Sequence, residues 1–321
     1  MRILLWHVHG SWTTSFVQGG HEYVLPVDAE RGPDGRGRAQ TWDWPDSVTE
    51  ASAEDLAGLD VDVVLLQRPH EEDLVREWLG RRPGYDVPAV YLEHNTPGGH
   101  APATRHPYAD QQAIPIVHVT AFNRLFWDCG SAPTTVIEHG VVDPGHRYVG
   151  DEPRAAVVLN DPIRRGRAVG TDLLSAMSGA VPLDVFGMGV DGLAAHLGLP
   201  ERRMRTFENL SQADLHQALG RRRLYLHTTR WTSLGLSLLE AMHLGLPIVA
   251  LATTEVVSAV PAGAGVVSTR PEALAEAARR FLIRPHEARM AGMAAREAAL
   301  ERYGLKRFLD DWDRCLTALV S

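Results

Sequence analysis

Short apolar segments alternate with helical segments along the chain, and this alternation limits the fold more than any other feature. Segments such as 3–8 and 155–159 are apolar runs that end at a glycine or a polar residue. The order strand, glycine loop, helix, strand is typical of a parallel sheet covered by helices. The pattern stops in the polar segment 144–153 and then starts afresh. The sequence therefore predicts an α/β protein with two similar parallel-sheet domains.

Composition excludes several classes of protein. An apolar content of 45% and a charged content of 22% describe a globular chain, and a formal charge of -8 argues against a general nucleic-acid binder. The two cysteines, Cys129 and Cys315, lie too far apart in the chain to indicate a disulfide framework. The N-terminal segment becomes polar too early for a signal peptide, and no apolar run approaches about 20 residues. We therefore expect no transmembrane segment and a cytoplasmic location.

The segment 230–247 carries the most specific pattern in the chain. It begins as a loop with a glycine, continues as a short helix, and ends in Gly-Leu-Pro before the apolar strand 248–251. Glu240 lies just over one turn into the helix, among apolar residues, so its carboxylate needs a fixed partner. The backbone amides of 233–236, at the helix start, are suited to holding an anion.

This segment resembles the donor-site signature of retaining GT-B glycosyltransferases of family 4. The family pattern is Glu, seven residues, Glu, within Glu-Gly-Phe-Gly-Leu, Leu-Glu-Ala-Met and Gly-Leu-Pro. Nine residues match it: Gly235, Leu236, Leu239, Glu240, Ala241, Met242, Gly245, Leu246 and Pro247. The first glutamate does not, because Thr232 stands in its place. The alternative is an ordinary helix of an α/β domain with one buried glutamate.

The resemblance implies two Rossmann-like domains that face a cleft, the GT-B fold. Residues 1–150 would form the acceptor-side domain and 151–305 the domain that binds the nucleotide sugar. Residues 306–321 would form a helix that crosses back onto the first domain. The alternative for this helix, which has Phe308, Trp312 and Leu316 on one stripe, is packing on its own domain.

An arginine-rich loop follows the first strand of the second half. The family carries an arginine and a lysine here, which neutralise the donor diphosphate. Alignment places Arg164 on the family arginine and Val169 on the lysine, and Lys306 is the single lysine of the chain. We expect Arg165 or Arg167 to replace the lysine, because a departing diphosphate needs cationic help. The alternative is a solvated basic loop.

Loops of the first half supply further candidates. Gly10 would let backbone amides approach the donor phosphate, with His9, Ser11 and Thr96 on the acceptor side. His94 ends a strand where the family often has a histidine that touches the transferred sugar. The alternatives are a plain turn at Gly10 and a structural role for His94. The segment 29–44, rich in glycine, arginine and aspartate, is predicted to be a long loop.

We expect neither a metal nor a cofactor. Two Asp-x-Asp patterns, Asp60 with Asp62 and Asp311 with Asp313, resemble a metal motif of another glycosyltransferase fold. The first begins a strand and the second belongs to a helix, so both are interpreted as surface carboxylates. No other metal or nucleotide motif occurs.

The sequence thus predicts a glycosyltransferase that moves a sugar from a nucleoside diphosphate sugar to a small-molecule or glycan acceptor. As the resemblance implies, the anomeric configuration would be retained and no metal required. His94, Arg164 and Glu240 would be catalytic. The donor would be bound by Gly10, Arg164, Arg165, Thr232, Ser233, Leu234, Gly235, Leu236 and Glu240.

Two alternatives remain open. The missing glutamate and lysine favour a catalytically weakened GT-B protein that acts as a binding or partner subunit. A sugar-nucleotide epimerase would share the fold, but it would need carboxylates as acid and base.

Overall fold

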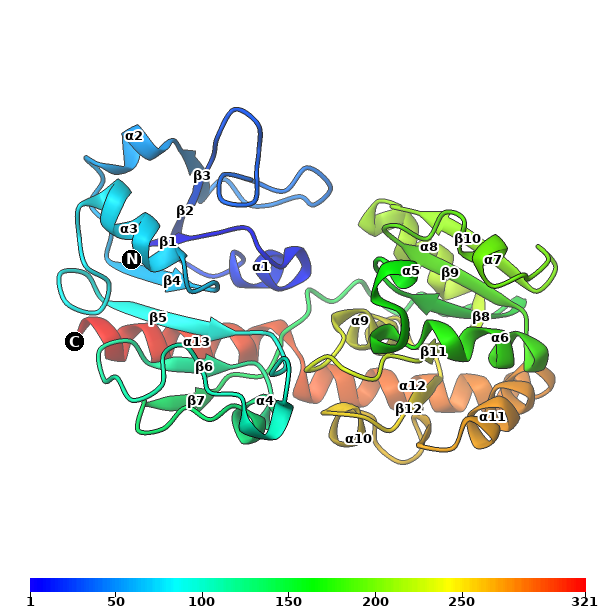
Figure 1. Ribbon diagram of the computed structural model, residues 1–321. Coiled ribbons are helices and arrows are strands. Elements are labelled where there is room, and N and C mark those ends of the chain that lie inside the picture. The colour runs from blue at the N-terminus through cyan, green and yellow to red at the C-terminus, as the bar shows by residue number, and fades with distance from the viewer. The chain divides into compact units, whose positions relative to one another are not determined.

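The computed structural model describes the chain from Met1 to Ser321 and divides it into two compact units (Figure 1). Unit 1 comprises Met1–Val142 with Leu305–Ser321, and unit 2 comprises Asp143–Gly304. Each unit contains one sheet whose strands all pair in parallel. The predicted α/β fold with two parallel sheets is confirmed.

The sheet of unit 1 has seven strands in the order β3-β2-β1-β4-β5-β6-β7. Its central strand β4 is buried along its whole length, as expected for a strand covered by helices on both faces. The strands are β1 (Arg2–Leu5), β2 (Glu22–Pro26), β3 (Val48–Ala51), β4 (Val63–Leu66), β5 (Ala89–Glu93), β6 (Ile116–His118) and β7 (Thr134–Val136). The helices are α1 (Gly10–Phe16), α2 (Ala53–Leu56), α3 (Glu71–Leu79), the 3-10 helix η1 (Ala101–Ala103), α4 (Ala121–Phe126) and α13 (Leu305–Val320).

The last helix, α13, drawn in red in Figure 1, belongs to unit 1. Its stripe of Phe308, Trp312 and Leu316 is buried, and the Trp312 ring lies edge-on to Trp12 of α1 at a centroid distance of 5.6 Å. Gly140 allows this contact, because a Cβ there would lie 2.3 Å from Cβ of Phe308. Of the two arrangements open for this helix, the structure has the one on the first domain.

The sheet of unit 2 has six strands in the order β10-β9-β8-β11-β12-β13. They are β8 (Glu152–Val158), β9 (Leu183–Gly187), β10 (Met204–Glu208), β11 (Arg222–His227), β12 (Ile248–Leu251) and β13 (Gly265–Ser268). The helices are α5 (Pro162–Arg165), the 3-10 helix η2 (Gly166–Val169), α6 (Thr171–Ala180), α7 (Leu193–His196), α8 (Gln212–Arg221), α9 (Leu236–Leu244), α10 (Val256–Ala259), α11 (Pro271–Ile283) and α12 (Pro285–Arg302).

Residues 143–150, which the sequence assigns to the first domain, lie in unit 2. The amides of Arg147 and Tyr148 both donate to the carbonyl of Leu244, each over 3.1 Å. The Tyr148 hydroxyl donates to the carbonyl of Arg223 over 2.9 Å. These bonds hold the segment on the end of α9 and the start of β11.

Each unit has its own apolar core around its sheet. Leu4, Leu66 and Tyr91 lie in the core of unit 1, and Val157 and Val249 lie in that of unit 2. No helix combines the length with the apolar character that crossing a bilayer requires.

Candidate functional site

The strand order of each sheet reverses at one place, and the predicted site residues gather there. In unit 2 the chain runs from β8 outward to β10 and returns to β11 on the other side of β8. In unit 1 it runs from β1 outward to β3 and returns to β4. Ligands of open parallel sheets bind beyond the carboxyl ends of the strands at such a switch point. The loops after β8 and β11, and those after β1 and β4, are therefore the candidate site of each unit.

The loop after β11 leads into α9 through Gly235. This glycine is the N-cap residue, and no side chain caps the helix, so the amides of the first turn face outward. A Cβ at position 235 would lie 2.9 Å from Cε1 of His227, which explains the glycine. His227 is buried with both ring nitrogens unpartnered, and burial lowers its pKa to about 4, so the ring is neutral at pH 7.

Glu240 lies on α9 and is 6% exposed. His216 of α8 faces it, with Nε2 3.5 Å from a carboxylate oxygen of Glu240. The sequence predicts a fixed partner for Glu240; the structure places this imidazole beside the carboxylate, while the side-chain nitrogen of Gln212 donates to the same Nε2 over 2.9 Å. An ionised carboxylate offers about four acceptor positions, so capacity for a ligand's hydroxyl groups remains.

The loops after β8 and β11 are tied to each other. Gly170 has φ +79°, and a Cβ there would lie 2.1 Å from the carbonyl oxygen of Thr228, so only glycine fits. Three further bonds connect the loops: Thr228 Oγ1 to the carbonyl of Val169 (2.9 Å), and the amides of Arg230 and Trp231 to the carbonyl of Ala168 (2.8 and 3.1 Å). The loops after β8 and β11, residues 159–170 and 228–235, are therefore tied into one surface, called the wall below.

Arg164 and Arg165 lie at the end of α5 in this wall. Arg164 is largely exposed and pairs with Asp161 over 2.5 Å. Burial, followed by the charge of Arg164, lowers the pKa of Arg165, which still leaves its guanidinium charged at pH 7. The segment that the sequence describes only as a loop is a short helix followed by the 3-10 helix η2.

Arg167 and Arg230 share a single carboxylate. Arg167 Nη1 lies 2.9 Å from Asp172, and Arg230 Nη1 lies 2.5 Å from the same group. Arg230 also donates to the carbonyl of Arg167 over 2.9 Å. Val169, between them in the chain, is 2% exposed and packs in the core, so its position cannot present a charge to a ligand.

Unit 1 presents neutral rings at its switch point. His9 and His94 lie with ring centroids 4.0 Å apart, and His139 lies 6.5 Å beyond His94. Burial lowers the pKa of His9 to about 4 and that of His139 to about 3, and holds that of His94 well below its usual value. The structure thus brings together His9 and His94, which the sequence places on the acceptor side and at the transferred sugar.

Gln67, the first residue after β4, orients His94. Its amide nitrogen donates to the carbonyl of Trp6 over 2.7 Å. Its oxygen is therefore the acceptor, and it lies 3.2 Å from Nε2 of His94. This arrangement assigns the His94 proton to Nε2.

Gly10 begins α1, and the indole of Trp42 covers it. A Cβ at position 10 would lie 2.1 Å from the Trp42 ring. The glycine therefore admits an aromatic side chain from the predicted long loop, and the approach of a phosphate to the same amide stays a prediction. Ser11 follows on α1, and Thr96 lies half-buried after β5.

Comparisons with known proteins agree with this geometry. Residues 189–298, which include 230–247, match the family model described as glycosyl transferases group 1. Over this segment the chain is similar to the group 1 glycosyltransferases. The resemblance drawn from the sequence is confirmed, while the role of Thr232 within the Glu-x7-Glu pattern stays a prediction.

Solved structures show the same fold over the whole length of the chain. Sucrose-phosphate synthase from Thermosynechococcus elongatus is 13% identical, with a TM-score of 0.76 over 99% of each chain. HepE from Anabaena, solved with UDP-glucose, is 15% identical, with a TM-score of 0.68 over 99% of this chain and 100% of that one. AviGT4, involved in avilamycin A biosynthesis, is 15% identical, with a TM-score of 0.63 over 100% and 98%. No sequence match was found among curated proteins.

Sequence reasoning assigned no role to three residues at the switch points: Gln67, Trp42 and Arg230. Gln67 could have been found, because it is a polar residue directly after a buried strand, as His94 is. Trp42 could not, because its contact with Gly10 joins a long loop to a distant turn.

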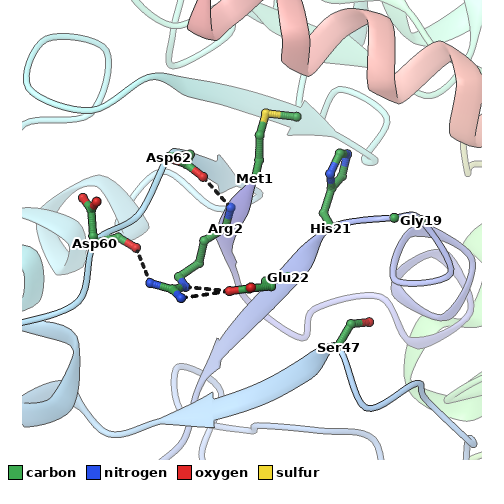
Figure 2. Close-up of a pocket in the computed structure, with 9 residues that line it drawn as sticks. Met1, Arg2, Gly19, His21, Glu22, Ser47, Asp60 and Asp62 are labelled. Carbon is green, nitrogen blue, oxygen red and sulfur yellow. Dashed lines mark hydrogen bonds and ion pairs between the residues drawn. The ribbon is translucent and has the colours of Figure 1, made fainter.

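A separate pocket of about 490 Å³ lies at the opposite edge of the unit 1 sheet, near the amino ends of β1, β2 and β4 (Figure 2). Arg2 crosses it, bonded to Glu22 and to Asp60 and Asp62. No predicted site residue lines it. We place the site at the carboxyl ends, because parallel sheets bind ligands there.

The Asp-x-Asp carboxylates take part in ion pairs and hydrogen bonds. Asp60 pairs with Arg81, and Asp62 accepts from the amide of Arg2. Asp311 pairs with Arg307 on α13, and Asp313 with His21. No three histidine, cysteine, aspartate or glutamate side chains in the chain converge as metal ligands would.

Proposed function

We propose that this protein transfers a glycosyl group from a nucleoside diphosphate sugar to a hydroxyl group of a small-molecule or glycan acceptor. The observation that carries the proposal is the wall formed by the loops after β8 and β11. It combines arginines, the uncapped start of α9 and the buried carboxylate of Glu240 at the switch point of unit 2. Each of these groups suits one part of a nucleoside diphosphate.

Glu240 accepts hydrogen bonds from the ribose hydroxyls of the donor. The backbone and side chains from Thr232 to Leu236 face the diphosphate and the sugar. Helix starts bind phosphates because their amides are unpaired and the helix dipole favours a negative charge. Arg164 and Arg165 offset the charge that develops on the diphosphate as it leaves.

The proposed chemistry retains the anomeric configuration. The bond from the anomeric carbon to the diphosphate oxygen breaks, and the acceptor oxygen forms a new bond to that carbon on the same face. The acceptor's proton passes to the leaving phosphate oxygen, so no enzymic base is required. His94, held by Gln67, lies beside the transferred sugar, with His9, Ser11 and Thr96 nearer the acceptor. The arginines make a metal unnecessary, and no cofactor takes part.

A test uses the purified protein with UDP-, GDP- and dTDP-linked sugars, each with and without a panel of hydroxyl acceptors. Release of the nucleoside diphosphate that depends on an acceptor supports transfer. The coupling constant of the anomeric proton in the product reports retention, and an unchanged rate in EDTA supports metal independence. UDP sugars come first, since the structure of HepE contains UDP-glucose.

A second candidate is a weakened GT-B protein that binds a sugar nucleotide without transferring it. Two observations favour it: Thr232 is neutral where the resembled family has glutamate, and Val169 is buried where that family has lysine. Donor binding without acceptor-dependent release would support this candidate. Conversion of the donor sugar into its epimer would support an epimerase.

A further inference from the structure

We propose that Arg230 binds the diphosphate of the donor directly, with Arg167 beside it and Asp172 as the positioning residue for both. This inference rests on the proposed function, because it names the group that recognises the leaving diphosphate. Arg230 begins the segment 230–247 but precedes its first matched residue, Gly235, so the resemblance assigns it no role. Three observations carry it: the place of Arg230 at the switch point of the sheet, the N–H groups of its guanidinium that make no bond to the protein, and the local excess of positive charge.

Arg230 is held at the switch point by bonds that fix both its backbone and its side chain. Its amide donates to Ala168 over 2.8 Å, and its Nη1 donates to the carbonyl of Arg167 over 2.9 Å. The guanidinium then meets Asp172 at the start of α6, with distances of 2.5 and 3.0 Å from its two Nη atoms. The side chain thus spans the two loops that a ligand at the switch point must face.

The guanidinium keeps donors for a ligand. Of the five N–H groups of an arginine, three account for the bonds to Asp172 and Arg167. The side chain is 26% exposed, and its Nε–H and one N–H of Nη2 make no hydrogen bond to the protein. A fixed guanidinium binds phosphate oxygens well, because its planar fork is already oriented.

The charges of the wall leave room for an anion. Arg167 and Arg230 meet a single carboxylate, that of Asp172. Arg164 and Arg165 lie near Asp161, beside which Glu208 adds a second negative charge. One positive charge therefore remains in excess, around Asp172. Asp172 holds Arg167 and Arg230 together but neutralises only one of them. A diphosphate therefore supplies the charge that this cluster lacks.

Calorimetric titration of the full-length protein with UDP, GDP, dTDP and the corresponding monophosphates tests the proposal. For the nucleotide that binds, Arg230→Gln is expected to weaken binding of the diphosphate about 10- to 100-fold, as loss of a hydrogen bond to a charged group would. Binding of the monophosphate is expected to weaken by a smaller factor. Arg230→Lys, which keeps the charge, recovers part of the loss.

The matched control is Arg221→Gln. Arg221 is also paired with an aspartate, Asp151, but it lies at the end of α8, before the amino end of β11. Binding of the diphosphate by Arg230→Gln within twofold of this control would overturn the proposal, as would equal losses for diphosphate and monophosphate. If Arg230→Gln does not fold, as judged by circular dichroism, Arg230→Lys and Arg167→Gln take its place. The same comparison is then made, the loss of affinity for the diphosphate against the loss for the monophosphate. If the native protein binds none of the three diphosphates, the proposed function fails and this inference with it.

Discussion

The two switch points hold their side chains by different physical means. In unit 2, arginines and carboxylates form ion pairs, such as Arg230 with Asp172, and the carboxylate of Glu240 lies 3.5 Å from His216. In unit 1, the rings of His9, His94 and Trp12 pack together, and burial keeps the histidines neutral. A charged wall suits a diphosphate, while neutral rings suit a sugar or an acceptor. The same topology thus provides two chemically distinct surfaces.

Loss of the buried carboxylate should have the largest effect. Glu240→Ala is expected to weaken binding of the nucleoside diphosphate about 100-fold or more, because each hydrogen bond from a ribose hydroxyl to a charged group contributes about 1.5–3 kcal/mol. Calorimetric titration with the nucleotide that binds the native protein measures this loss.

Glu240→Gln and Glu287→Ala serve as controls. Gln keeps an acceptor oxygen and should recover part of the affinity. Glu287 is a half-buried residue of α12 paired with Arg284, and its loss should leave binding unchanged. If Glu240→Ala binds the nucleotide as the native protein does, the nucleotide has been placed on the wrong residues.

Acid should unfold unit 1 before unit 2. Five histidines of unit 1 have a lowered pKa, namely His7, His9, His94, His118 and His139, against His227 and His243 in unit 2. The unfolded chain takes up protons below pH 6.5, whereas folded His9 and His139 do so only near pH 4 and 3. Stability is therefore complete above pH 6.5 and falls as the pH drops. At pH 5, His9 and His139 each lower the free energy of unfolding by about 2 kcal/mol.

Tryptophan fluorescence follows this difference, because seven of the eight tryptophans lie in unit 1 and only Trp231 lies in unit 2. On acidification the fluorescence change should precede the main loss of far-ultraviolet circular dichroism. His139→Asn removes one site of proton uptake and should move the fluorescence transition to lower pH. If fluorescence and circular dichroism change at the same pH, and His139→Asn does not shift the fluorescence transition, unit 1 does not unfold first.

The contact of Gly10 with Trp42 can be broken by one methyl group. Gly10→Ala would place a Cβ 2.1 Å from the indole of Trp42, so that ring must move. We expect a loss of about 1–3 kcal/mol in the free energy of unfolding and a change in fluorescence. Urea unfolding measures the first quantity.

Gly20→Ala is the control, because Gly20 has no neighbouring atom within 4 Å of a Cβ and its loss should be small. Equal effects of the two variants would mean that Trp42 is not seated on Gly10 in solution. A change at Gly10 alone would show that the neutral surface of unit 1 depends on packing.

Local patterns predicted the fold and part of the site. The alternation of apolar strands with helices specifies two parallel sheets, and the Gly235-to-Pro247 matches specify α9 with Glu240 on it. Residues that act through distant contacts were not predictable. Arg230 meets Asp172 and Trp42 covers Gly10 only because the sheets bring separate loops together, and no spacing along the chain encodes either contact.

The smallest effect is expected from restoring the glutamate that the resembled family carries. Thr232 is half-buried in a loop, so Thr232→Glu should change the free energy of unfolding by no more than about 0.5 kcal/mol. In the proposed donor site the added negative charge would face the diphosphate, so it should weaken binding of the free nucleoside diphosphate by a few-fold, or about 1 kcal/mol. Thr232→Gln, of similar size and neutral, should not.

The ratio of transfer rate to diphosphate affinity separates two roles for position 232. If Thr232→Glu weakens the diphosphate but raises transfer from one of the UDP-, GDP- or dTDP-linked sugars, a carboxylate there contacts the sugar, and threonine sets the donor preference. If Thr232→Glu and Thr232→Gln behave alike, position 232 touches neither the diphosphate nor the sugar. In that case the charge of the unit 2 surface comes from the arginines and Glu240 alone.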